Sequence, residues 1–121
     1  MEQKKSLWEI LVPTHSNNGA EYAMSHHHAW DDYVRGISGG LTILKTSKGQ
    51  WLDETGRLFS EKMIPVRVAC TESDIDQIIK YTLSHYEQKA VIAYEVSTKV
   101  KIVHEDDSAV HSESSLTGLC E

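Results

Sequence analysis

The chain has 121 residues, with 18 Asp and Glu against 12 Lys and Arg and a formal net charge of −6. This length fits one domain with a single hydrophobic core, and the acidic balance excludes nucleic acid as a default partner, because phosphate binding needs clustered basic side chains. No apolar run reaches the roughly 20 residues that cross a bilayer, and Cys70 and Cys120 have neither metal-ligand spacing nor the density of a secreted disulfide scaffold. We therefore expect a cytoplasmic protein without a membrane partner.

The first part of the chain predicts a strand, a helix and a second strand. Residues 7–14 are apolar and β-prone and alternate between two faces. After the polar stretch 15–19, apolar side chains return at the spacing of one helix face: Trp30, Tyr33, Val34 and Ile37. Gly36 and the pair Gly39-Gly40 mark the end of this helix, and residues 41–44 form the second strand.

The middle of the chain predicts turns followed by one long strand. Residues 47–49 and 53–56 are expected to be turns on either side of a short segment, 50–52. The third strand runs from residue 58 to residue 70. Pro65 inside it cannot donate a ladder hydrogen bond, so the strand either lies at an edge there or carries a bulge. An irregular backbone at that point could present amides to a ligand.

The last part predicts a helix, a strand and a tail. Residues 71–74 offer an N-cap and early acidic side chains. The buried stripe of the helix consists of Ile75, Ile78, Ile79, Thr82, Leu83 and Tyr86. Residues 90–103 are β-rich. We expect one domain over residues 1–104 and an acidic C-terminal tail over 105–121, which is either disordered or ordered against a neighbour.

The predicted order is βαββαβ, the ferredoxin-like arrangement of an α+β sandwich in which two helices back an antiparallel sheet. Such a sheet has one face without helices. In small sandwiches that face often packs on another subunit, and the apolar content of both faces of strands 7–14 and 58–70 agrees with this. We therefore expect an oligomer rather than a monomer.

Three successive histidines are the most conspicuous candidate for metal binding. His27 with Asp31, or His28 with Asp32, has the i, i+4 spacing that brings two ligands together on a helix. No further ligand pair lies at metal-site spacing. We therefore favour a solvated helix start for His26 and its neighbours and expect no metal site.

Three other side chains are candidates for a binding or catalytic site. Glu61 lies on a predicted strand with Phe59 and Met63 on the same face, and is either an exposed edge residue or a paired, partly buried carboxylate. Tyr94 is a core or interface aromatic, or a ligand contact. Trp51 either covers a pocket or caps the core. Composition and spacing leave these alternatives open.

Two segments resemble a known enzyme family. Residues 66–70, Val-Arg-Val-Ala-Cys, are followed by the second helix and by residues 86–94, Tyr-Glu-Gln-Lys-Ala-Val-Ile-Ala-Tyr. Together they resemble the phage-encoded S-adenosylmethionine lyases, formerly described as hydrolases, which show an aromatic-Glu-Gln motif before their last strand. The resemblance implies a PII-like ferredoxin fold, a homotrimer with active sites between subunits, and no cofactor.

The resemblance also implies a reaction and roles for individual residues. The carboxylate of S-adenosylmethionine attacks its own γ-carbon and expels methylthioadenosine, leaving homoserine lactone, so that catalysis consists chiefly of folding and shielding the substrate. Glu61 is the candidate catalytic carboxylate that orients the cationic substrate. Met63 and Ile64 would complete the pocket with main-chain groups, and Trp51 or Tyr94 would contact adenine or the sulfonium. The alternative is a non-enzymatic PII-like module for ligand binding or regulation.

Overall fold

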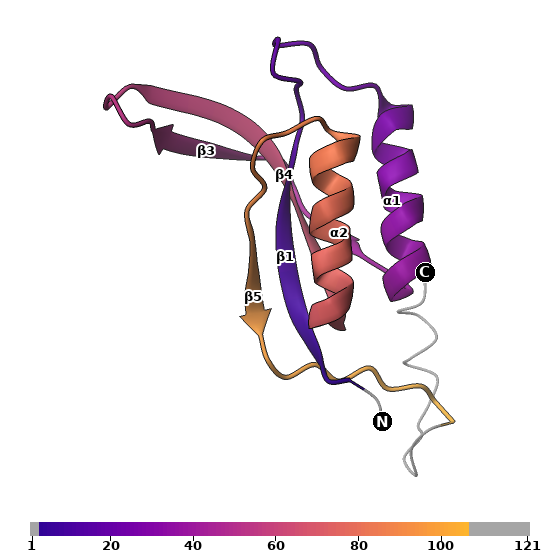
Figure 1. The fold of residues 1–121 in the computed structure, drawn as a ribbon. Coiled ribbons are helices and arrows are strands. Elements are labelled where there is room, and N and C mark those ends of the chain that lie inside the picture. Colours follow the sequence, from indigo (N-terminus) through magenta and orange to yellow (C-terminus); the bar gives the residue numbers. More distant parts are fainter. Residues whose placement is uncertain (1–2, 107–121) are drawn as a thin grey trace.

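Two helices lie side by side against one sheet in the computed structural model, which describes residues 3–106 (Figure 1). The elements in chain order are β1 (Lys5–Pro13), α1 (Met24–Ser38), β2 (Thr42–Ile43), β3 (Ser47–Leu52), β4 (Leu58–Thr71), α2 (Glu72–His85) and β5 (Ala93–Ser97). All pairings are antiparallel, and the sheet order is β2-β4-β1-β5, with β3 on the same edge of β4 as β2. The predicted ferredoxin-like α+β fold is confirmed.

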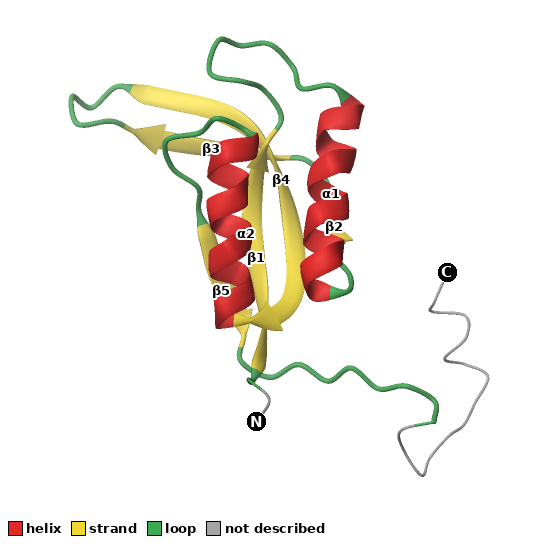
Figure 2. Cartoon of the chain, turned by 45° about the vertical axis from the view of Figure 1, so that its right-hand side comes forward, coloured by secondary structure: helices red, strands yellow, loops and turns green. Residues whose placement is uncertain are grey.

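The central strands β1 and β4 carry apolar side chains on both faces, as the sequence predicts. Their register places Ile10 opposite Val66 and Glu9 opposite Arg67. Both helices cover the same face of the sheet (Figure 2). The core between them and the sheet consists of Ile10, Val12, Trp30, Val34, Val66, Val68, Cys70, Ile75, Ile78 and Tyr86. Neither helix within residues 3–106 covers the face that carries Glu9 and Arg67, which we call the helix-free face.

Pro65 lies where the ladder on one side of β4 is interrupted, so β4 is an edge at this point, one of the two positions that its missing N–H allowed; its register with β1 is regular. β2 pairs Ile43 with Val66, whereas β3 pairs Ser47 with Met63, so that the three residues 44–46 lie opposite only two residues of β4. The Pro65 carbonyl accepts a hydrogen bond of 2.9 Å from the amide of residue 44. The proline nitrogen therefore faces the irregular part of this edge, where the ladder is interrupted.

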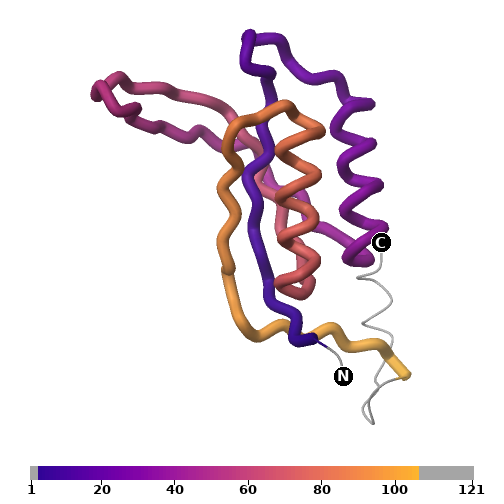
Figure 3. The backbone as a smooth tube through the Cα atoms, viewed as in Figure 1, coloured from indigo at the N-terminus to yellow at the C-terminus, as the bar shows by residue number. Residues whose placement is uncertain are grey.

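β3 and the first part of β4 form a hairpin that projects from the rest of the molecule (Figure 3). The prediction of a turn at 47–49 is wrong, because these residues are the start of β3. They are polar and largely exposed, but the ladder to β4 satisfies their backbone groups. The turn predicted at 53–56 is confirmed: Asp53 Oδ1 accepts hydrogen bonds from the amides of Thr55 and Arg57, at 2.8 and 2.9 Å, and Gly56 has a φ of 85°.

Local capping explains where α2 begins and where α1 ends. Thr71 and Asp74 form a capping box at the start of α2, in which the Thr71 hydroxyl accepts from the Asp74 amide at 3.1 Å. The predicted buried stripe of α2 is confirmed by Ile75 and Ile78, which are 1% and 0% exposed. α1 ends at Gly39, whose φ of 90° places it in the left-handed region.

The last strand is shorter than predicted. The structure gives β5 only five residues, Ala93–Ser97, in place of 90–103, because the chain turns after Ser97, where Lys99 N donates to the Ser97 hydroxyl at 3.1 Å. Residues 98–106 then cross below the sheet (Figure 3). The predicted tail over 105–121 lies almost wholly outside the described residues. Neither described helix is long and apolar enough to span a membrane.

Candidate functional site

A groove of about 680 Å³ lies between the base of the β3–β4 hairpin and the segment after α2. We call it the hairpin groove. It opens on the face of the sheet that carries no helix. Its lining consists of Leu11, Pro13, Asn17, Trp51, Phe59, Glu61, Met63, Gln88, Lys89, Ala90, Val91 and Ile92. The walls are mainly apolar and a few polar groups converge on them, which is the usual composition of a small-molecule site.

Trp51 and Glu61 form the polar pair of this groove. The alternation of β4 places Phe59, Glu61 and Met63 on one face, as predicted. The Trp51 indole Nε1 donates a hydrogen bond of 3.1 Å to Oε1 of Glu61. Glu61 is exposed in the single chain, so the structure combines the two alternatives that the sequence left open: the carboxylate is solvent-accessible and it has a partner.

Gly49 allows the indole to reach Glu61. The hairpin register pairs Glu61 with Gly49, not with Trp51, so the indole must lie back across the strand to meet the carboxylate. A Cβ atom at position 49 would lie 3.0 Å from Cζ2 of Trp51 and 3.1 Å from Cε of Met63. The missing side chain therefore makes room for both residues in the groove.

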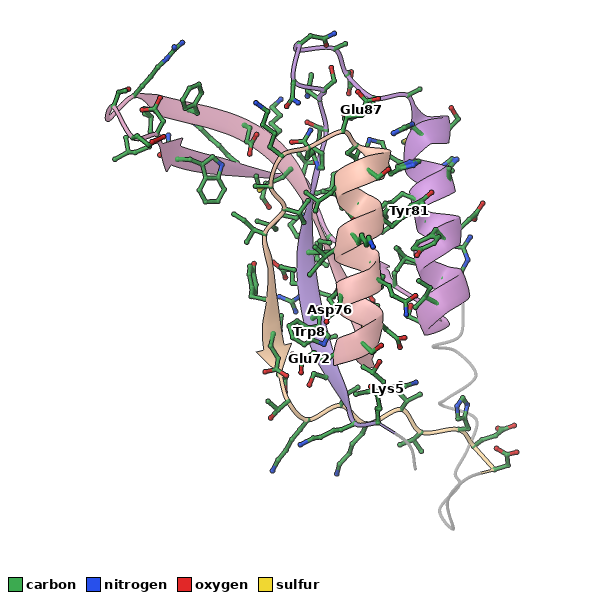
Figure 4. The ribbon with its side chains drawn as sticks, in the orientation of Figure 1. Lys5, Trp8, Glu72, Asp76, Tyr81 and Glu87 are labelled. Carbon is green, nitrogen blue, oxygen red and sulfur yellow. The ribbon has the colours of Figure 1, made fainter. Side chains whose placement is uncertain are left out.

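The opposite wall follows from the way in which α2 ends. The amides of Glu87 and Gln88 donate to the carbonyls of Ser84 and Leu83, at 3.2 and 2.9 Å, which is the Schellman pattern. Glu87 has a φ of 51°, in the left-handed region where glycine is usual. Figure 4 shows Glu87 at the upper end of α2. The aromatic-Glu-Gln motif thus stops the helix and directs residues 88–92 along the groove.

The predicted site residues do not all lie in the same pocket. The structure brings Trp51, Glu61 and Met63 together in the hairpin groove. The Ile64 side chain lies on the helix-covered face, in a separate hollow of about 170 Å³. Tyr94 lies on the helix-free face but outside the lining of the groove, because its hydroxyl donates a hydrogen bond to Glu9.

Glu9 forms a polar cluster with Arg67 and Tyr94 that the sequence reasoning missed. Glu9 is only 7% exposed, and Arg67 Nε donates to its Oε1 at 2.8 Å. Burial works to raise the pKa of Glu9, but the hydrogen bonds from Tyr94 and Arg67 together outweigh it and hold the pKa below its ordinary value. The hydrogen bond to the Glu9 carboxylate raises the pKa of Tyr94. The sequence signal for this cluster was Glu9, a single carboxylate in an apolar strand, together with Arg67 in the segment Val-Arg-Val.

The prediction of a solvated helix start is wrong for His26 and His27. His26 Nε2 donates to the His85 carbonyl at 2.7 Å, and His85 Nε2 donates to the His26 carbonyl at 2.8 Å, with the two rings stacked 3.9 Å apart. His27 Nδ1 shares a hydrogen bond of 2.6 Å with the Tyr86 hydroxyl. The hydrogen bonds of these imidazoles connect the start of α1 to the end of α2. Within residues 3–106 no group of three His, Cys, Asp or Glu side chains is arranged to hold a metal ion.

Comparisons with known proteins relate the fold to two kinds of protein. No family model and no curated protein matches the sequence. A phage S-adenosylmethionine lyase, solved with S-methyl-5′-thioadenosine, has a TM-score of 0.61 at 13% identity, over 81% of this chain and 84% of that one. CutA1 from Oryza sativa has a TM-score of 0.61 at 9% identity, covering 83% and 85%. The periplasmic divalent cation tolerance protein CutA from Archaeoglobus fulgidus has 0.60 at 7%, covering 81% and 87%. At these identities the shared property is the fold.

Proposed function

We propose that the protein is an S-adenosylmethionine lyase that uses the hairpin groove as its active site. The observation that carries the proposal is the Trp51–Glu61 pair, which sets an aromatic ring and a carboxylate side by side in an apolar groove. A cationic ligand with a flat ring system needs these groups. The resemblance of residues 66–94 and the fold shared with a phage lyase support the same substrate.

The proposed reaction needs no nucleophile from the protein. A carboxylate oxygen of the substrate forms a bond to its γ-carbon, the carbon–sulfur bond breaks, and the electron pair leaves with sulfur. The carboxylate and the sulfonium neutralise each other, so the products are neutral methylthioadenosine and homoserine lactone with its ammonium group intact. A reaction that loses charge is favoured by a dry, apolar environment. The apolar lining of the groove, which includes Leu11, Phe59 and Met63, supplies that environment.

Glu61 serves best as the partner of the substrate ammonium. A carboxylate beside the sulfonium would stabilise the charged substrate more than the transition state, in which that charge is disappearing, and would slow the reaction. The ammonium keeps its charge throughout, so its ion pair with Glu61 orients the substrate without this penalty. The Trp51 ring would then stack on the adenine. Met63 lines the groove and Ile64 does not, so Ile64 would contribute only main-chain groups.

We propose a homotrimer in which a neighbouring subunit closes each groove. The groove is open in the single chain, and Trp51 and Glu61 are exposed. Exposed apolar side chains lie in the groove and along β5: Phe59, Tyr94 and Val96. Apolar surface of this kind marks a protein interface, and its burial would exclude water from the site. We also propose that the protein is cytoplasmic, because the substrate is made there.

The direct test is to incubate the pure protein with S-adenosylmethionine and to chromatograph the products. We expect methylthioadenosine together with homoserine lactone at early times; homoserine at early times would indicate hydrolysis instead. Glu61→Gln should lose most of the turnover, and Lys62→Gln, a change at the neighbouring position outside the groove lining, should keep it. Substrate that stays intact for hours at high enzyme concentration would refute the activity.

A glycine pair tests the geometry of the groove. Gly49→Ala places a methyl group against Trp51 and Met63 and should reduce turnover by displacing the indole. Gly36→Ala is the matched control, because a Cβ there meets no atom within 4 Å. If the two variants are equally active, the position of the Trp51 indole does not matter for the reaction. Light scattering on both variants should give the mass of a trimer.

The second candidate is a non-enzymatic PII-like module that binds a small ligand. It is favoured by the equally close fold of the CutA proteins, of which the one from Archaeoglobus fulgidus is a divalent cation tolerance protein. Calorimetry with S-adenosylmethionine distinguishes the two: tight binding without product would favour the module. If the protein neither binds nor converts S-adenosylmethionine, the remaining explanation is a protein that serves only in assembly.

A further inference from the structure

A second pocket, of about 740 Å³, lies at the opposite end of the sheet from the hairpin groove. We call it the basal pocket. It is bounded by the start of β1, the middle of β4, the turn after α1 and the segment after β5. The side chains that define its chemistry are Lys5, Leu7, Thr42, Arg67, Ile102 and His104. Figure 4 places Lys5 at this lower end and Glu87 at the upper end, so the two pockets are distinct.

The charged side chains in the described lining of the basal pocket are all basic. Lys5 and Arg67 line it together with His104, and none of the described acidic residues does. The chain as a whole has six more acidic than basic residues, so the charge of this pocket is opposite in sign to the net charge of the protein. Arg67 already pairs with Glu9, whereas Lys5 has no ion-pair partner within residues 3–106, and a bound anion would supply one.

Arg67 is held in place with part of its guanidinium group still available. Its Nε donates to Glu9, and this contact fixes the side chain on the helix-free face. Within the described part of the chain its two Nη groups have no hydrogen-bond partner, and 41% of the side chain is exposed. Thr42 lies directly opposite Arg67 in the β2–β4 ladder and brings a hydroxyl group to the same place. A guanidinium edge and a hydroxyl are suitable donors for a carboxylate or a phosphate.

The turn after α1 gives the pocket a fixed wall. Gly39 ends the helix in the left-handed conformation. The Ser38 hydroxyl lies 2.8 Å from the Val34 carbonyl and 2.7 Å from the Gly40 carbonyl, which fixes the following turn against the helix end. Apolar side chains, among them Leu7 and Ile102, complete the lining. The pocket thus combines a basic edge with apolar walls.

We propose that the basal pocket binds a small organic anion with a carboxylate or phosphate head and an apolar body. The head pairs with Lys5 and the free edge of Arg67, and the body packs between Leu7 and Ile102. The site lies away from the Trp51–Glu61 pair, so this binding does not depend on the proposed lyase activity.

The test is a titration of the full-length ¹⁵N-labelled protein, followed by NMR. The probes are benzoate and phenyl phosphate, with benzamide as the neutral analogue of benzoate and inorganic phosphate as an anion without an apolar body. We expect benzoate and phenyl phosphate to shift the amides of residues 39–42 with saturation, benzamide to shift none of them, and inorganic phosphate to bind more weakly than phenyl phosphate. A preference between the two aromatic probes identifies the head group. Added salt should weaken the binding.

Lys5→Gln with Lys4→Gln as its control tests the assignment of the pocket. Both variants remove one exposed positive charge, but only Lys5 lines the pocket. The loss of one partly exposed ion pair predicts an affinity about fivefold lower for Lys5→Gln and an unchanged affinity for Lys4→Gln. Equal losses in the two variants, equal binding of benzamide and benzoate, or shifts confined to the hairpin groove would each overturn the proposal.

Discussion

Replacement of Glu87 by glycine should stabilise the protein. Glu87 has a φ of 51°, and no hydrogen bond of its side chain is found among the described residues. The left-handed conformation costs an L-residue about 1–2 kcal/mol, and glycine loses about 0.5–1 kcal/mol of extra backbone entropy on folding. The difference predicts a gain of about 0.5–1 kcal/mol for Glu87→Gly. With an m-value of about 1.5 kcal/mol/M, the urea midpoint should rise by roughly 0.3–0.7 M.

Urea unfolding of a short substitution series, at one protein concentration, separates the backbone from the side chain. Glu87→Ala keeps the strained conformation and should gain only about 0.3 kcal/mol, from removal of a negative charge at the C-terminal end of a helix. Glu87→Asn should fall between alanine and glycine, because asparagine tolerates the left-handed region. A glycine variant that is less stable than the natural protein, or an alanine variant that gains as much as glycine, would refute the assignment of strain to this position.

Three further predictions concern contacts between the helices and the start of α2. Thr82→Val leaves the buried Trp30 Nε1, now 2.9 Å from the hydroxyl, without an acceptor and should cost about 1–3 kcal/mol in urea unfolding, whereas Thr82→Ser should cost much less. Thr71→Ala removes the capping box and should cost about 1 kcal/mol by the same measurement, against no change for the exposed Thr46→Ala. Burial lowers the pKa of His27 below 6.5, so the unfolded chain binds a proton that the folded chain excludes, and stability should fall as the pH drops through 6.5 toward the lowered value. His27→Gln should flatten that part of the stability curve between about pH 5 and 8, and an unchanged curve would contradict the assignment.

Local patterns predicted the elements that depend on local interactions. The N-cap at Thr71 and the spacing of Ile75 and Ile78 identify α2, because a helix satisfies its backbone within its own segment. β3 was missed in part, since residues 47–49 have the composition of a turn and become a strand only through pairing with β4. The role of the histidines was misjudged for a similar reason: His26 contacts His85, 59 residues away along the chain.

The hairpin groove was predictable up to the point where register matters. Alternation along one strand is enough to place Glu61 and Met63 on the same face. The contact from Trp51 to Glu61 needs the hairpin register and the space above Gly49, and a shift of one residue would turn the indole to the other face. Glu9 and Tyr94 meet across 85 residues, which no local pattern shows.

The central position of β1 has a consequence for folding. Its main partner is β4, so the core sheet forms only when the long loop between Pro13 and Leu58 closes. Closing this loop costs conformational entropy before any apolar contact forms. The protein should therefore fold more slowly than proteins whose contacts are mostly local. The β3–β4 hairpin can pair within microseconds, but it lies outside the core. During synthesis β1 therefore leaves the ribosome early and remains unpaired until β4 has followed it.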